Sequence, residues 1–65
     1  MKRPSFERYL REHGCQFHRE GGSHEVWIHV GNQKTSTVPR KREINKYLVR
    51  KICHDLEIPP PTSAS

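Results

Sequence analysis

A histidine stands directly behind a short glycine-rich segment, at the start of a run of β-branched and aromatic residues. His24 follows Gly22 and Ser23, and residues 25–30 have the composition of a β-strand. This spacing places His24 at the rim of a predicted sheet, where a substrate can reach it. Imidazole has the side-chain pKa closest to neutral pH and is the most frequent general acid or base. We therefore expect His24 to transfer a proton.

The charge of the chain predicts an anionic partner. Twelve Lys and Arg residues stand against 7 Asp and Glu, which makes the formal net charge +5, and most of the excess lies within residues 34–51. Such a field attracts nucleic acid, an acidic protein or an anionic surface. Together with a rim histidine it favours RNA, because RNA carries its own nucleophile, the 2′-hydroxyl. Cleavage then needs only proton transfer and stabilisation of negative charge at phosphorus, so we expect no metal and no other cofactor.

Cationic and hydroxyl side chains are the candidate RNA-binding residues. Arg19 lies on the other arm of the predicted hairpin, and its planar guanidinium suits a phosphate. Ser23 can donate a hydrogen bond to the substrate or orient the imidazole of His24. Further basic candidates follow the third predicted strand: Arg40, Lys41 and Lys46. A charged helix face is also often only solvated, and both interpretations stay open for these residues.

Cys15 and Cys53 do not predict a metal centre or a disulfide framework. They are the only two cysteines, they lie far apart in the chain, and no histidine stands at a familiar zinc-ligand spacing from them. Both fit buried positions equally well, since a free cysteine behaves as a small hydrophobic residue.

The length and composition predict one small domain with a thin core. The chain has 65 residues, of which 31% are hydrophobic and 29% charged. This composition is polar for a folded domain but is not that of a disordered chain. The sequence has no apolar run long enough to span a bilayer, and its first residues lack the apolar middle region of a signal peptide. We expect a cytoplasmic protein that has no membrane partner.

The first half of the chain predicts a helix and a β-hairpin. Ser5 is the expected N-cap of the helix, whose apolar residues recur at three- and four-residue spacing, and Gly14 is expected to end it. Residues 15–20 and 23–30 are the expected strands. Gly21-Gly22 can supply the positive φ angles of a tight turn between them.

The second half predicts a third strand and a second helix. Pro39 ends the strand over residues 34–38, and Asn45 is a good cap for a helix with an apolar stripe. Residues 59–65, rich in proline and serine, are expected to form a flexible tail after a single domain over residues 1–58. The order α-β-β-β-α fits an α+β domain in which a three-stranded antiparallel sheet carries two helices on one face.

The alternation of side chains along the second strand does not decide which face of the sheet carries His24. If Val26 and Ile28 pack against the helices, His24 points toward the helix layer, unless the strand end or a bulge exposes it. Trp27 then lies on the open face as a base-stacking platform or a partner anchor; in the alternative it covers the sheet. His29 is expected on the opposite face from His24, as a solvated strand residue.

The chain resembles the HicA family of bacterial toxins, small messenger-RNA interferases that pair with HicB antitoxins. The resemblance extends over nearly the whole chain and combines several features. These features are Gly14 after the first helix, Arg19 before Gly22-Ser23-His24, Val38-Pro39 at the end of the third strand, and a basic helix with Leu48 and Ile52 that runs to Ile58.

The resemblance implies a fold similar to the double-stranded-RNA-binding domain and a toxin that is an endoribonuclease. His24 would be its essential residue, messenger RNA its substrate and inhibited translation its effect. A HicB-like antitoxin would inactivate it by covering that histidine. Two alternatives remain from other classes: a non-catalytic RNA-binding module, and an inactive toxin relative that only binds a HicB-like antitoxin.

Overall fold

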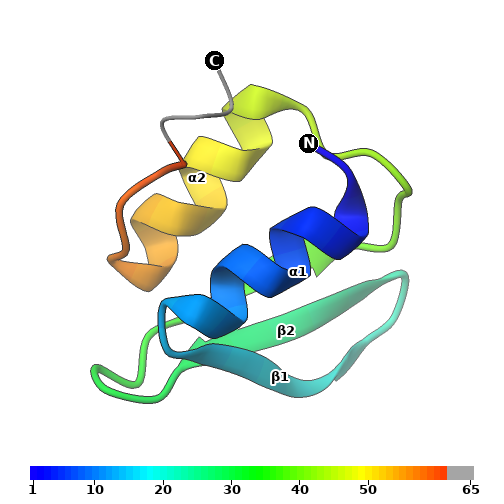
Figure 1. Cartoon of the computed structure of the whole chain (residues 1–65). Coiled ribbons are helices and arrows are strands. Elements are labelled where there is room, and N and C mark those ends of the chain that lie inside the picture. Colours follow the sequence, from blue (N-terminus) through cyan, green and yellow to red (C-terminus); the bar gives the residue numbers. More distant parts are fainter. Residues whose placement is uncertain (62–65) are drawn as a thin grey trace.

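Five elements follow one another in the computed structural model, which describes residues 1–61. They are α1 (Arg3–Glu12), β1 (Cys15–Gly21), β2 (His24–His29), β3 (Thr35–Pro39) and α2 (Lys46–Leu56). The strands form an antiparallel sheet in the order β1-β2-β3, and both helices lie on one face of it (Figure 1). The predicted fold class is confirmed, and the arrangement is consistent with a double-stranded-RNA-binding-domain-like fold.

Helix α1 begins before its predicted cap. Lys2 is the N-cap residue and Pro4 lies in the first turn, where the missing N–H of proline has no intrahelical partner to lose. Ser5 is therefore a residue of the helix, and its prediction as the cap was wrong. Gly14 follows the helix with φ +81°, as predicted, because glycine adopts this conformation without strain.

Helix α2 begins and ends close to the predicted positions. The side chain of Asn45 accepts a hydrogen bond from the backbone N–H of Leu48 at 2.9 Å, which confirms the predicted cap. Glu57 ends the helix in the left-handed conformation. The hydroxyl of Tyr9 in α1 donates to the carbonyl of Pro59, in the first part of the predicted tail. Residues 62–65 of that tail lie outside the described residues.

The core fills the space between the helices and the sheet. Trp27 is 1% exposed and is its largest side chain. Around it pack buried residues from both helices, from the sheet and from the segments flanking α2: Phe6, Leu10, Cys15, Val38, Ile44, Val49, Ile52, Cys53, Leu56 and Ile58. Trp27 therefore covers the helix-facing side of the sheet. The interpretation of Trp27 as a platform on the open face was wrong.

Both cysteines are free and buried in this core. Burial raises the pKa of the Cys15 thiol. Burial, with a smaller effect of the neighbouring Cys15, raises the pKa of Cys53 to about 11. The two thiols therefore stay protonated at neutral pH and act as small core residues.

Strand β2 turns its odd-numbered residues toward the helices. Trp27 belongs to the core, and Glu25 bonds to Arg3 of α1. Because successive side chains of a strand alternate, His24 and Val26 point to the open face. Packing of the even-numbered residues against the helices was thus the wrong alternative, and His24 needs no bulge beside it to reach the open face.

His29 lies on the opposite face from His24, as predicted, but it is not simply solvated. It is half-buried, and its Nδ1 accepts hydrogen bonds from the backbone N–H groups of Gly31 and Asn32 at 3.1 and 3.2 Å. Its imidazole therefore stabilises the β2–β3 turn. No helix within residues 1–61 is long and apolar enough to cross a membrane.

Candidate active site

The hairpin between β1 and β2 presents His24 at the end of the sheet. Gly21 and His24 are the last cross-strand pair, so Gly22 and Ser23 form a two-residue turn. Gly22 has φ +71°, a conformation that two-residue hairpin turns need and that glycine adopts readily. Gly21 does not have a positive φ. Of the two glycines, Gly22 alone therefore has the positive φ angle that was predicted for the turn. His24 is exposed as the first residue of β2.

His24 pairs with one residue on each neighbouring strand. Its cross-strand partners are Gly21 on β1 and Pro39 on β3. Side chains of directly opposed residues lie on the same face, about 4.5–5.5 Å apart at Cβ. Gly21 has no side chain, and the nearest side-chain atom at its position is Cγ2 of Val26, 3.3 Å from where a Cβ of residue 21 would lie. Because His24 is exposed, a phosphate group can approach its imidazole.

A bulge in β1 determines the direction of Arg19. The register shifts between Phe17, which pairs with Trp27, and Arg19, which pairs with Val26. His18 is therefore the extra residue of the bulge. In a regular strand Arg19 would share the helix-facing side with Phe17, whereas the extra residue turns it to the side of Val26. Arg19 is consequently on the open face.

Arg19 and His24 are diagonal neighbours on that open face. Diagonal cross-strand positions lie roughly 7–8 Å apart, within reach of a long side chain. Both residues are exposed, and Arg19 has no ion-pair partner in the part of the chain that the structure describes. A single phosphodiester group can thus contact the imidazole and the guanidinium together.

Ser23 is in contact with the histidine ring. Its Oγ lies 3.3 Å from Nδ1 of His24, and both side chains are exposed. A hydrogen bond at Nδ1 leaves Nε2 for the substrate and favours one orientation of the ring. Ser23 therefore lies where it can orient the imidazole.

The three remaining basic candidates lie in different places. Arg40 forms an ion pair with Glu20 of β1. Lys41 is exposed and lines a cavity at the end of the sheet. Lys46 is the first residue of α2, in the helix layer, with its Nζ 5.6 Å from the ring centre of Tyr47. The structure thus brings together His24, Arg19 and Ser23, whereas Lys46 does not belong to this group.

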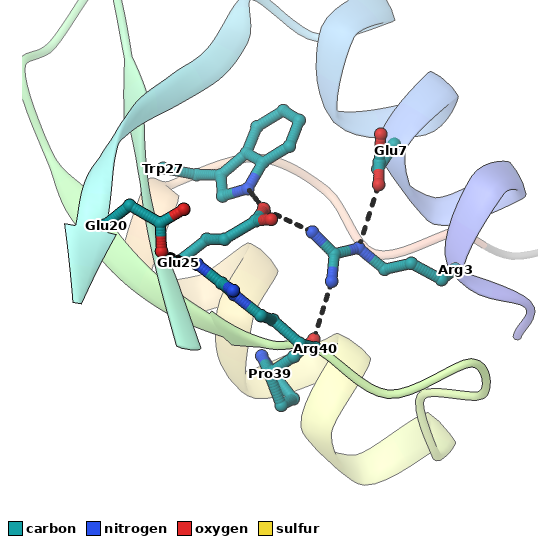
Figure 2. Close-up of polar contacts among 7 residues, drawn as sticks. All are labelled: Arg3, Glu7, Glu20, Glu25, Trp27, Pro39 and Arg40. Atoms are coloured by element: carbon teal, nitrogen blue, oxygen red, sulfur yellow. Dashed lines mark hydrogen bonds and ion pairs between the residues drawn. The ribbon is translucent and has the colours of Figure 1, made fainter. Parts of the chain in front are cut away.

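Arg3 of α1 holds the end of the sheet in place (Figure 2). Its Nη2 donates to Oε1 of Glu25 at 2.5 Å, and its Nη1 donates to the carbonyl of Pro39 at 2.7 Å. Trp27 Nε1 donates to the same oxygen of Glu25 at 3.0 Å. The Nε of Arg3 lies 3.2 Å from the carboxylate of Glu7. One guanidinium therefore connects β2, which carries His24, and β3 to α1.

These contacts place Arg3 next to the candidate site without exposing it. Glu25 follows His24 in the chain and Pro39 pairs with His24, so Arg3 fixes two neighbours of the histidine. Arg3 was not among the predicted site residues. Pro4 in the first turn was a signal for a helix start at Arg3, but no local pattern indicates a partner 22 residues away.

No group of three or more His, Cys, Asp and Glu side chains within residues 1–61 is arranged to hold a metal ion. The candidate site consists of one imidazole, one guanidinium and one hydroxyl on an open sheet face. These groups can move a proton and bind an anion.

Fold and site together define a small α-β-β-β-α protein with an exposed histidine and arginine on its open sheet face. The sequence model of the family described as HicA toxin of bacterial toxin-antitoxin matches residues 4–58. This match extends from the first turn of α1 to Ile58, just beyond α2, and the chain belongs to the HicA toxin family. No curated protein sequence and no solved structure gave a significant match.

Proposed function

We propose that this toxin is an endoribonuclease that cleaves messenger RNA in the cytoplasm and thereby inhibits translation. His24 is the residue that transfers the proton, and the RNA 2′-hydroxyl is the nucleophile. One observation supports this proposal most directly: the bulge in β1 puts Arg19 on the same exposed face as His24. An imidazole and a guanidinium on one exposed face are the two groups that cleavage of an RNA phosphodiester needs.

The reaction follows from the chemistry of RNA. Neutral Nε2 of His24 takes the proton of the 2′-hydroxyl, and the 2′-oxygen attacks the adjacent phosphorus. The bond from phosphorus to the 5′-oxygen breaks, and that oxygen takes a proton from the imidazolium or from water. The products are a 2′,3′-cyclic phosphate and a 5′-hydroxyl. A positioned general base contributes roughly 10²- to 10⁴-fold to such a step.

Arg19 stabilises the transition state in this scheme. Negative charge accumulates on the non-bridging oxygens as the 2′-oxygen attacks, and a guanidinium at a diagonal position can donate two parallel hydrogen bonds to them. Loss of one such preorganised donor costs about 10²–10³ in rate. Ser23 supports the reaction by orienting the ring of His24 at Nδ1.

The other basic candidates bind the RNA chain outside the reacting group. Lys41 lies at the sheet end that carries His24, two residues after Pro39, and has no ion-pair partner within residues 1–61. Arg40 must exchange Glu20 for a phosphate. Both of these side chains are largely exposed, at 43% and 66%, so breaking their ion pair costs little. Lys46, in the helix layer, contributes to the long-range attraction of RNA.

A HicB-like antitoxin is the proposed protein partner. Because the candidate site is an exposed sheet face and not a deep cavity, a bound protein can neutralise it simply by covering His24 and Arg19. No rearrangement of this domain is needed. The antitoxin then competes directly with RNA for the same surface.

The test is induced expression in bacteria of the wild type, of His24→Ala and of the control His54→Ala. His54 is an exposed histidine on α2, in the other layer of the domain. We expect growth arrest and fragmented messenger RNA with the wild type and the control, and neither with His24→Ala. The purified variants are compared by circular dichroism to establish that each is folded.

Two results would contradict the proposal. If folded His24→Ala cleaves RNA at the wild-type rate, His24 is not the proton-transfer group. If the wild type binds RNA but leaves it intact and does not arrest growth, the protein is a non-catalytic binding module or an inactive relative.

A further inference from the structure

A cavity of about 750 Å³ opens at the same end of the sheet as His24. The start of α1 forms one side of it, and the segment between β3 and α2 forms the other. Arg3 and Glu25 also line it, and Figure 2 shows their contact. Its volume is within the range of about 300–1,000 Å³ of small-ligand sites. The cavity is thus large enough for a nucleotide unit.

The carboxylates that line the cavity already have cationic partners. Glu25 accepts hydrogen bonds from Arg3, and Glu7 forms an ion pair with the same guanidinium. The carboxylate of Glu43 lies 3.7 Å from the amino group of Met1. The charge of Arg3 is therefore offset by carboxylates, and these acidic groups do not neutralise the other cations of the cavity.

Three cations on the cavity wall have no such partner. Lys2, Lys41 and Arg42 are exposed, and within residues 1–61 none of them forms an ion pair. Like charges around one cavity repel one another and raise its affinity for an anion. The wall therefore favours a ligand that carries negative charge.

The pairing of His24 with Pro39 and the short segment from Pro39 to Lys41 limit the distance between His24 and the cavity. Pro39 pairs with His24, and antiparallel partners are about 4.5–5.5 Å apart at Cα. Lys41 is two residues after Pro39, which adds at most about 7 Å. The two Cα atoms of His24 and Lys41 are thus no more than about 13 Å apart. His24 points to the open face, whereas Arg3 and Glu25 line the cavity on the helix side. An RNA strand that has one phosphodiester at His24 must therefore pass around the end of the sheet to place a neighbouring phosphodiester in the cavity.

We infer that Lys2, Lys41 and Arg42 form a site for a phosphodiester group of the RNA chain that neighbours the group cleaved at His24. This inference rests on the proposed function, because it takes RNA as the ligand. Arg3 forms the base of the site and does not bind the phosphate, since Glu25 and Glu7 hold its guanidinium. Arg40 also lines the cavity, but its ion pair with Glu20 sets it apart from the three cations that have no partner within residues 1–61.

The salt dependence of RNA binding tests the site. For single strands, each phosphate that a protein neutralises contributes about −0.7 to the slope of log K against log salt concentration. We use His24→Ala protein, which prevents cleavage, and a fluorescently labelled single-stranded oligoribonucleotide. Fluorescence anisotropy at several salt concentrations then measures the slope.

The variant is Lys41→Gln/Arg42→Gln, and its matched control is Arg8→Gln/Arg50→Gln. Both pairs of substitutions remove two positive charges, but Arg8 and Arg50 are exposed helix residues that do not line the cavity. We expect the cavity variant to lose this one phosphate contact, and therefore to have a slope about 0.7 less steep and about tenfold weaker binding at low salt. The control should retain the slope of the parent. Urea unfolding establishes that both variants are folded.

Equal slopes for the two variants would overturn the inference, because the cations would then act only through the net charge. An unchanged slope in the cavity variant would also overturn the inference. The three cations would then be a binding surface for an acidic protein and not for RNA. Cleavage assays of proteins that retain His24 distinguish this failure from failure of the proposed function. If the wild type does not cleave RNA but the cavity variant has the shallower slope, only the catalytic proposal fails.

Discussion

The guanidinium of Arg3 and the carboxylate of Glu25 form the closest connection between the first helix and the strand that carries His24. Their atoms Nη2 and Oε1 lie 2.5 Å apart, and the side chains are only 11% and 22% exposed. The carboxylate also accepts a hydrogen bond from Trp27, so a charge that would be costly to bury has two donors. The position of His24 thus depends on an ion pair that links the helix layer to the sheet.

Replacing Arg3 with Gln should destabilise the protein strongly. The substitution leaves Glu25 partly buried without its cation and the carbonyl of Pro39 without its donor. Breaking one side of a buried pair costs about 3–5 kcal/mol, a large share of the stability of a domain this small. Arg3→Lys keeps the charge but not the planar fork, and we expect an intermediate loss. Urea unfolding at pH 7 measures both.

A second variant separates the ion pair from the packing of the Arg3 side chain. Arg3→Gln/Glu25→Gln removes both charges, so its loss should be smaller than the sum of the two single losses. If Arg3→Gln changes the free energy of unfolding by less than about 0.5 kcal/mol, the pair is not a structural link.

Replacing Arg19 with Gln should lower kcat for RNA cleavage by about 10²-fold, with a much smaller change in KM. The reason is that its guanidinium acts on charge that develops only in the transition state. Arg50→Gln makes the same chemical change on the exposed face of α2 and should leave kcat unchanged. Steady-state kinetics on a short oligoribonucleotide provides both constants. A rise in KM alone would show that Arg19 only binds RNA.

Asp55 should make the stability depend on pH in the acid range. Lys51 and Ser36 donate to its carboxylate at 2.9 and 3.0 Å, and the hydrogen bond from Lys51 is the largest cause of its lowered pKa. A carboxyl whose pKa is lower in the folded state stabilises the fold above the unfolded-state pKa of about 3.9. This contribution is lost as the pH falls through the lower folded value.

Asp55→Asn therefore should cost about 1 kcal/mol at pH 7 and progressively less below about pH 4. Urea unfolding between pH 7 and pH 2 measures the difference from the wild type. Glu12→Gln, at an exposed position that has no ion pair within residues 1–61, is the control and should show no such trend. A difference that stays constant down to pH 2 would mean that the carboxylate is not responsible.

Replacing Glu57 with Gly should stabilise the protein by about 0.5–1 kcal/mol. Glu57 ends α2 with φ 58° and ψ 43°, a conformation that is strained for residues with a Cβ and free for glycine. Its ion pair with Lys34, at 3.9 Å, is more than half exposed on both sides and contributes little. Thermal unfolding measures the gain, and Glu57→Ala, which keeps the strain, should show none. A loss of stability in the glycine variant would mean that the Lys34 contact matters more than the backbone.

Short-range signals in the sequence were sufficient for the order of elements and for the place of His24. Gly14 ends α1 and Asn45 caps α2 because a left-handed residue and a capping side chain act within a few residues of themselves. The two-residue turn that brings His24 to the end of the sheet also depends only on neighbouring residues. The cap of α1 was misassigned because two signals competed, Ser5 and the proline before it.

The orientation of β2 was decided only by the tertiary structure. Both of its faces carry apolar side chains, with Trp27 on one and Val26 and Ile28 on the other, so alternation alone does not distinguish them. The face with Trp27 packs against the helices, where the large indole is 1% exposed and its N–H reaches the carboxylate of Glu25. Arg3 of α1 also supplies the cation that Glu25 needs on that face.

The sequence by itself thus determined the α-β-β-β-α order, the exposed turn with His24 and the excess of positive charge. The tertiary structure decided which side chains share the open face. The β1 bulge turns Arg19 toward it, and the partner of Glu25 lies 22 residues away. A local pattern holds no information about either, because a bulge depends on the register between two strands and an ion pair depends on how distant segments pack.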